Sequence, residues 1–145
     1  MLLKQLSVFL ENKPGTLSEV TKVLKENNIN IRALSMADTA DFGILRIIVP
    51  EVDKVYQILK SKKFTVKSTE VVAVKVADKP GGLNSIIELF NNENINIEYM
   101  YAFVNKIEDR LDPVIIFKVH NIQSAINILV KNDVDIVKTS DILWN

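Results

Sequence analysis

The chain has 145 residues, with 18 lysines and arginines balanced by 18 aspartates and glutamates, and it has no cysteine. The absence of cysteine excludes disulfides, thiol nucleophiles and thiolate metal ligands, and it is typical of the reducing cytoplasm, where we expect the protein. The balanced charge, without a basic run, argues against nucleic acid as a partner, because phosphate binding depends on clustered Lys and Arg. No apolar stretch approaches about 18 residues, so we expect no membrane span and no membrane partner.

The first elements of the chain predict a strand followed by a helix. Gln5–Leu10 alternates between two sides, as a half-buried strand does. Pro14 and Gly15 interrupt the strand. Thr16 followed by Glu19 predicts a capping box at the start of the helix, with the hydroxyl and the carboxylate satisfying open backbone donors.

The rest of the first half continues with alternating signals for strands and helices. Helical spacing of apolar residues is found at Leu17, Val20, Val23 and Leu24, and again at Val52, Val55, Tyr56 and Leu59. Strands are predicted at Ile31–Ala37, Ile44–Val49 and Phe64–Thr69, with a turn at Asp38–Phe42. The order strand, helix, strand, strand, helix, strand is that of the split βαβ, or ferredoxin-like, unit, an α+β fold.

The second half repeats the first. Asn12–Leu17 returns as Asp78–Leu83, 66 residues later counted from Lys13 to Lys79, and Asn28–Ile31 returns as Asn94–Ile97 in the same register. Two matches in one register indicate duplication of a structural unit. We therefore predict two units, at residues 1–69 and 70–145.

The predicted elements of the second unit follow the same order. Its strands are expected at Val71–Val76, Ile97–Val104, Val114–Val119 and Asp135–Leu143, and its helices carry Leu83, Ile86, Ile87, Phe90 and then Ile122, Ala125, Ile126, Leu129. Val49 aligns with Val119 at a larger offset than the loops do, so the second unit has extra residues, which we place at Lys106–Pro113. Units of about 70 residues are marginal alone, so we expect the two to pack together.

The repeated loop after the first strand of each unit is the candidate binding feature. A Pro-Gly turn can simply redirect the chain. However, backbone donors at a helix start attract a carboxylate or phosphate, and Asn12 or Asp78 could accept a hydrogen bond from an ammonium group. Together these groups suit a zwitterion, that is, a free amino acid. The glycine spacings of a Walker loop and of a dinucleotide fingerprint are absent.

The loop, the Asn-Ile-Asn-Ile entry into the second strand and the order of elements resemble the ACT domain, an amino-acid-binding regulatory module, in two tandem copies. The phrases Ile31–Ser35 and Asp41–Gly43 are similar to those of small stand-alone tandem ACT proteins. The resemblance implies that the two units lie side by side and pair through their second strands. That pairing would give a continuous antiparallel eight-stranded sheet with the helices on one face.

The resemblance also implies two ligand sites, each formed by the loop of one unit and the second strand of the other. One site would consist of Asn12, Gly15, Thr16 and Leu17 with Tyr99, Met100, Tyr101 and Ala102. The other would consist of Asp78, Gly81, Gly82 and Leu83 with Ala33, Leu34, Ser35 and Met36. Because Thr16 aligns with Gly82 and Asn12 with Asp78, we predict two non-equivalent sites. Whether one or both bind, and which amino acid, stays open, although the nearby side chains favour an apolar or aromatic ligand.

An alternative function rests on the aromatic row Tyr99, Tyr101 and Phe103, which alternates along one strand. If Met100 and Ala102 face the helices, this row lies on the open face of the sheet. An exposed apolar patch usually indicates a partner, so the row predicts a homodimer interface. The chain would then be a structural or assembly subunit that works without a ligand. Base stacking on RNA is disfavoured, because no basic patch accompanies the row.

Catalysis has little support. His120 is the only histidine, and it follows a predicted strand at the position where the first unit has Pro50. Acylphosphatases share the fold but need an arginine in the first loop, where this chain has Lys13 and Lys79. We therefore predict a non-enzymatic regulatory sensor without cofactor or metal, which acts in trans on an enzyme of amino-acid metabolism or on another regulator.

Overall fold

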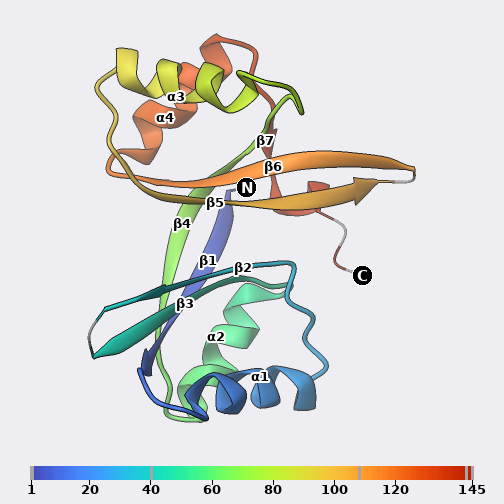
Figure 1. Cartoon of the computed structure of the whole chain (residues 1–145). Coiled ribbons are helices and arrows are strands. Elements are labelled where there is room, and N and C mark those ends of the chain that lie inside the picture. The colour runs from blue at the N-terminus through green and yellow to red at the C-terminus, as the bar shows by residue number, and fades with distance from the viewer. Residues whose placement is uncertain (1, 40, 108, 143, 145) are drawn as a thin grey trace. The chain divides into compact units, whose positions relative to one another are not determined.

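The computed structural model describes residues 2–39, 41–107, 109–142 and 144 (Figure 1). Five residues lie outside the described ones: Met1, Ala40, Glu108, Leu143 and Asn145. Met1 and Asn145 are ends of the predicted units, Ala40 and Glu108 belong to the two predicted turns, and Leu143 ends the last predicted strand. The chain folds into two compact units. The N-terminal unit is Lys4–Thr69. The C-terminal unit is Glu70–Leu143 and also includes Leu3.

The N-terminal unit has the predicted order of elements. They are β1 (Leu3–Glu11), α1 (Thr16–Glu26), β2 (Ala33–Asp38), β3 (Phe42–Ile48), α2 (Val52–Ser61) and the first part of β4 (Thr65–Lys75). The strand order is β2-β3-β1-β4, and both β1 and β2 pair antiparallel with β3. The central strands β3 and β1 are therefore flanked by strands from the two ends of the unit, as in the split βαβ arrangement.

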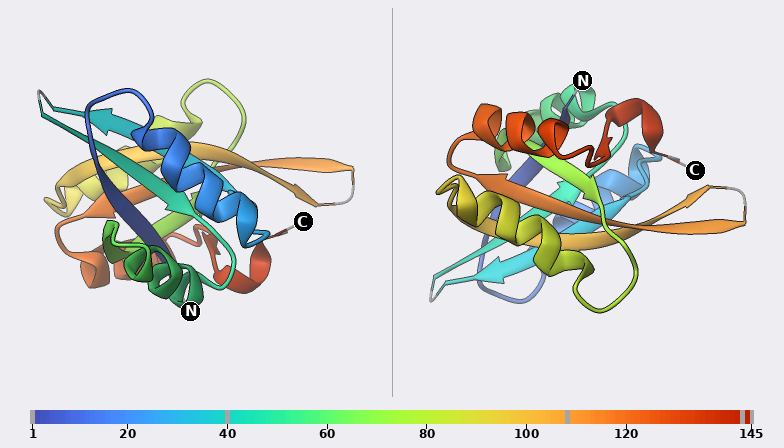
Figure 2. Two further views of the ribbon diagram at one scale, coloured as in Figure 1. Left: turned by 90° about the horizontal axis from the view of Figure 1, so that it is seen from below. Right: turned by 90° about the horizontal axis from the view of Figure 1, so that it is seen from above.

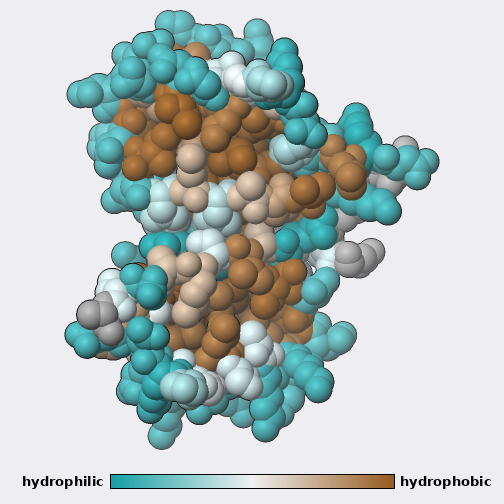
Figure 3. All heavy atoms as spheres, viewed as in Figure 1, coloured by the Kyte–Doolittle hydropathy of each residue, from teal (hydrophilic) through white to brown (hydrophobic). Residues whose placement is uncertain are grey.

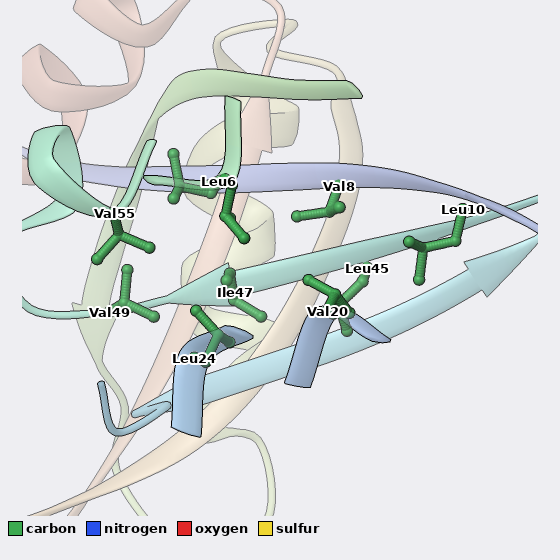
Figure 4. Packing of buried hydrophobic residues seen from close by; sticks show 10 residues of the cluster. Leu6, Val8, Leu10, Val20, Leu24, Leu45, Ile47, Val49 and Val55 are labelled. Atoms are coloured by element: carbon green, nitrogen blue, oxygen red, sulfur yellow. The ribbon is translucent and has the colours of Figure 1, made fainter. Parts of the chain in front are cut away.

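The core of the N-terminal unit lies between its sheet and both of its helices. Leu6, Val8 and Leu10 alternate along β1 and point to the helix side, where they meet Val20 and Leu24 of α1 (Figure 4). All five side chains are almost fully buried. Burial of each such side chain contributes about 1.5–3 kcal/mol. The buried residues of β1 therefore stabilise both the register of the strand and the packing of α1 on it.

The C-terminal unit has the same architecture. Its elements are the second part of β4, α3 (Gly82–Asn92), β5 (Ile97–Ile107), β6 (Arg110–Val119), α4 (Ile122–Lys131), β7 (Ile136–Val137) and the 3₁₀ helix η1 (Thr139–Asp141). The strand order is β7-β4-β6-β5, which matches the order in the N-terminal unit. Phe90 of α3 packs edge-to-face on Phe117 of β6, with the ring centroids 5.2 Å apart, and it lies in a core with residues of both helices.

The duplication is visible in the backbone as well as in the sequence. Left-handed conformations occur at Gly15 and Gly81 (φ 94° and 87°) and at Asn28 and Asn94 (both φ 56°). The four extra residues of the second unit lengthen the hairpin of β5 and β6, which extends beyond α3 and α4 (Figure 2). Equivalent positions are therefore 66 residues apart before this hairpin and 70 residues apart after it, as counted from Gly15 to Gly81 and from Lys63 to Asp133.

Two predictions about strands were wrong. The described residues form seven strands rather than eight, because Phe64–Thr69 and Val71–Val76 belong to the single strand β4. No Gly or Pro interrupts the extended backbone between them, and the run is rich in β-branched residues. The predicted last strand, Asp135–Leu143, is shortened to β7. The backbone amide of Lys138 donates to Oδ2 of Asp141 over 2.8 Å, which turns the chain into η1.

The α+β class is thus confirmed for each unit, with both helices on one face of its sheet. The pairing of the two units through their second strands stays a prediction. Among the described residues, no helix is long and apolar enough to cross a membrane.

Candidate ligand-binding loops

The first candidate loop joins β1 to α1. The Asn12 amide donates to the carbonyl oxygen of Asp41 over 3.2 Å, which fixes the start of the loop against the turn before β3. At its end Gly15 adopts φ 94° and ψ −21°, a left-handed conformation that side chains disfavour and glycine tolerates. The sequence Pro-Gly therefore has a defined role here, because it directs the chain from the end of the strand into the helix.

Thr16 closes this loop from inside rather than capping the helix. Its hydroxyl donates to the carbonyl oxygens of Glu11 at 2.9 Å and Lys13 at 3.1 Å. The predicted capping box of Thr16 and Glu19 was wrong, since Gly15 occupies the N-cap position and α1 has no side-chain cap. The pattern misled because the Pro-Gly turn starts the helix at Thr16 itself, one residue earlier than a Thr N-cap would require.

The second loop closes without a side chain. Gly81 is left-handed at φ 87°, and the Gly82 amide donates to the carbonyl oxygen of Lys79 over 3.0 Å. A Cβ on Gly82 would overlap the carbonyl oxygen of Ala77, which is the residue equivalent to Glu11. In the first loop the Thr16 hydroxyl contacts the carbonyl oxygen of Glu11. In the second loop the backbone of Gly82 itself lies against the equivalent carbonyl oxygen, that of Ala77.

Each loop leads into the N-terminus of an 11-residue helix, α1 or α3. The first backbone amides of a helix have no intrahelical acceptor, and the helix dipole adds partial positive charge at this end. Asn12 and Asp78 are exposed, and they precede these helix starts by four residues in the chain. Each unit thus combines a short polar residue with open helix amides within one short segment.

The predicted contact segment of β2, Ala33–Met36, divides between the two faces of its strand. Leu34 and Met36 pair with Ile47 and Leu45, both of the helix-side core, yet they are 56% and 48% exposed. Apolar side chains also reach the surface on the face of the molecule seen in Figure 3. The other two residues of the segment point to the opposite face.

The equivalent segment of β5, Tyr99–Ala102, divides in the same way. Met100 lies opposite the core residue Phe117 and so faces the helix side, while Tyr101 lies opposite Ile116 on the other face. A ligand on one face of such a strand touches only alternate side chains. The four predicted residues of each segment therefore form two pairs, and only one pair of each can contact a given ligand directly.

Two groups of the first loop have shifted pKa values. Nζ of Lys13 and Oε2 of Glu11 are 2.9 Å apart. The hydrogen bond from Lys13, and then its charge, lower the pKa of Glu11, while the same bond and charge from Glu11 raise the pKa of Lys13. Both side chains are well exposed to solvent, so water screens the pair.

The aromatic row of β5 is less exposed than predicted. Met100 and Ala102 do face the helix side, so the row lies on the opposite face, but Tyr99 and Tyr101 are half-buried and Phe103 is only 8% exposed. Further along this face, Nδ2 of Asn105 donates to the carbonyl oxygen of Asp141 over 3.0 Å. The segment after β7 therefore lies against this side of the strand. The row is therefore only partly exposed, since Phe103 is buried while Tyr99 and Tyr101 keep part of their surface, and the assembly-subunit alternative stays a prediction.

His120 has a structural role in the described residues. Its Nδ1 accepts from the Asn96 amide at 3.0 Å, and its own amide donates to the Asn96 carbonyl oxygen at 3.2 Å. These bonds tie the end of β6 to the start of β5. The part of the chain that the structure describes contains no cluster of three or more His, Cys, Asp or Glu residues suited to a metal ion.

A pocket at one end of the N-terminal unit escaped the sequence analysis. It has a volume of about 600 Å³ and borders the first loop. Its lining includes three phenylalanines and three lysines: Phe9, Phe42, Phe64, Lys13, Lys62 and Lys63. They come from β1, the loop after it, the start of β3, and the turn between α2 and β4. No local motif joins residues so far apart in the chain. A position-by-position comparison of the two units could have found them, because the second unit has no aromatic residue at these places.

The chain matches the family model of the ACT domain pair over residues 1–144, and it therefore belongs to the ACT domain family. Both loops and both split βαβ units described above fall within the match. ACT domain pairs are typical of amino-acid-binding regulatory domains, and the family is regulatory rather than catalytic.

Among solved structures, the chain is similar to protein BT0572 from Bacteroides thetaiotaomicron, at 42% identity over 97% of this chain and 95% of that one, with a TM-score of 0.88. It has the fold of the regulatory subunit of aspartate kinase from Thermus thermophilus in its ligand-free form, at 13% identity over 90% and 93% of the two chains (TM-score 0.58). The subunit from Thermus flavus matches at 12% identity over 90% and 93% (TM-score 0.55). The search of curated proteins found no match.

Proposed function

We propose that this protein is a cytoplasmic, non-enzymatic sensor of a free amino acid, built from two ACT units at residues 1–69 and 70–145. It acts in trans, as a homodimer, on an enzyme of amino-acid metabolism or on another regulator. The observation that carries the proposal is the paired arrangement of a polar side chain and a helix start, at Asn12 and again at Asp78. Similarity in fold to regulatory subunits of aspartate kinase supports a regulatory role.

In this proposal the amino acid binds between the loop of one unit and the second strand of the other. Its carboxylate lies at the amides of a helix start, and its ammonium group is accepted by Asn12 or Asp78. Leu17, which is 46% exposed, offers apolar contact beside the first helix start, and Leu83 is equivalent to it. The ligand changes the activity of a partner only by its different affinity for two arrangements of the chain.

Thermal unfolding in the presence of each of the twenty amino acids, at a few millimolar, tests the proposal. A ligand that binds only the folded state raises stability by about 2.7 kcal/mol at a hundred times its dissociation constant. We expect a shift of the midpoint for one chemical class. The double variant Asn12→Ala/Asp78→Asn should lose that shift, because both acceptors for the ammonium group are weakened or removed.

The control is Glu88→Gln, which removes an exposed carboxylate from the body of α3. It should keep the full response to the ligand. A folded wild-type protein that responds to none of the amino acids would contradict the proposal, and so would a response that survives in the double variant.

A further inference from the structure

The pocket at the end of the N-terminal unit has an apolar part made of three aromatic rings. Phe64 packs partly against the core, whereas Phe9 and Phe42 are 38% and 52% exposed. Exposed phenylalanines are costly to leave in water, since each ring carries a large apolar area. Their convergence on one hollow of about 600 Å³ has the size and the lining of a site for a small molecule.

The polar part of the same pocket carries an excess of positive charge. Lys13, Lys62 and Lys63 line it, against Glu11 and Glu19. Because Glu11 already pairs with Lys13 at 2.9 Å, the remaining pair of adjacent lysines is opposed by one carboxylate. This rim favours an anion beside the aromatic rings.

The C-terminal unit shows what the same architecture looks like without this chemistry. Where the N-terminal unit has Phe9 and Phe42, the C-terminal unit has Lys75 and Asp112, as the strand registers show. Nζ of Lys75 and Oδ2 of Asp112 form an ion pair at 3.5 Å. The fold therefore tolerates polar residues at these positions, and the phenylalanines of the N-terminal unit are not required to build it.

The difference continues on the turn after the second helix. Lys62 and Lys63 correspond to Asn132 and Asp133, with Lys63 and Asp133 both left-handed at φ 68° and 56°. Glycine is the residue most suited to this place. A lysine there costs roughly 1–2 kcal/mol of backbone strain relative to its relaxed conformation. The second unit has a residue of opposite charge at the equivalent position, so the fold does not require a lysine there.

From these observations we infer a second ligand site, specific to the N-terminal unit, that binds a small aromatic carboxylate. The ring lies against Phe9, Phe42 and Phe64, and the carboxylate meets the ammonium groups of Lys62 and Lys63. This site lies within one unit and goes beyond the amino-acid site proposed above, which depends on Asn12 and Asp78.

Phenylacetate is a suitable probe, and phenethylamine, which has the same ring with a positive charge, is its control. In a ¹H–¹⁵N NMR titration of the full chain, we expect phenylacetate to shift the amides of residues 9–11, 42 and 62–65. The equivalent amides at 75–77, 112 and 132–135 should stay in place, which gives an internal reference within each spectrum. Phenethylamine should bind at least about fivefold more weakly, because it is repelled by the lysines.

Two variants separate binding from folding. Lys63→Gly relieves the left-handed backbone, so the free energy of unfolding should stay equal or rise, while affinity for phenylacetate falls about threefold. Phe42→Ala removes an exposed ring and should weaken binding about tenfold, in line with the loss of an aromatic contact. Lys131→Gln, an exposed lysine in the last turn of α4, should leave affinity unchanged.

The inference is overturned if phenylacetate, up to about 10 mM, shifts no amide of the pocket, or shifts both units alike. It is also overturned if phenethylamine binds as well as phenylacetate, or if Lys63→Gly and Phe42→Ala leave affinity unchanged. The double variant Asn12→Ala/Asp78→Asn should still bind phenylacetate. Failure of the amino-acid proposal would therefore appear in a different experiment from failure of this one.

Discussion

The substitution Gly82→Ala should destabilise the C-terminal unit, although alanine is the better helix former. At most positions of a helix, this change gains up to about 1 kcal/mol. At Gly82, however, the new Cβ would overlap the carbonyl oxygen of Ala77 and lie 3.3 Å from Cγ1 of Val76. The oxygen belongs to the backbone, so the loop itself must move. Overpacking of this kind costs about 1–3 kcal/mol, and we expect a net loss of about 2 kcal/mol.

Gly43→Ala is the matched control. Gly43 is also buried, and an added Cβ would also be crowded, but by Cε of Met36. Met36 is a flexible side chain with 48% exposure, so it can turn away into solvent at little cost. We expect the free energy of unfolding to change by less than about 0.5 kcal/mol.

Urea unfolding followed by circular dichroism measures both variants. With a slope of about 2 kcal/mol per molar urea, a loss of 2 kcal/mol lowers the midpoint by about 1 M. A Gly82→Ala variant as stable as the wild type would show that the second loop does not close by the backbone contact described above.

Three further predictions concern the core, the first loop and the histidine. Phe90→Ala should cost about 3–5 kcal/mol in urea unfolding, because it empties a fully buried ring position. A carboxyl NMR titration should find the pKa of Glu11 below its usual range, and Lys13→Met should restore the usual value. Because folding lowers this pKa, the ion pair stabilises the fold at pH values above the pKa of the unfolded chain. That stabilisation is lost as the pH falls through the lowered pKa of the folded protein. His120→Ala should cost about 1 kcal/mol and speed hydrogen exchange of the Asn96 amide, whose acceptor is removed.

Most of the fold of each unit could be predicted from periodicity and duplication. Helical spacing placed α2 at its observed start, Val52, and alternation placed the core residues of β1 on one side. The errors lie where a tertiary contact decides. Nothing in Asp135–Leu143 shows that the carboxylate of Asp141 turns the chain after two paired residues. Likewise, no turn signal separates β4 into two strands, so the predicted break had only the repeat boundary to support it.

The candidate site was predictable in part, for a related reason. The loops are local in sequence, so their repetition was visible. The pocket of the N-terminal unit is not local, since Phe9, Phe42 and Phe64 lie in three separate segments of the chain. Its signal is a difference between two copies of one unit rather than a motif. Such a difference can be found only when the extra residues in the second hairpin have been placed correctly.

The unequal closure of the two loops has a consequence for amino-acid binding. At the start of α1 the hydroxyl of Thr16 already satisfies two carbonyl oxygens of the loop, so a ligand there meets a loop held by a movable side chain. At the start of α3 the same closure is made by the backbone at Gly82, and no side chain can adjust. A ligand carboxylate can therefore rearrange the first loop more readily than the second. Thr16→Ser keeps the hydroxyl and should preserve the thermal shift given by a bound amino acid. Thr16→Val removes the hydroxyl and should alter that shift. If the two variants show the same shift, the amino acid binds at the second loop alone.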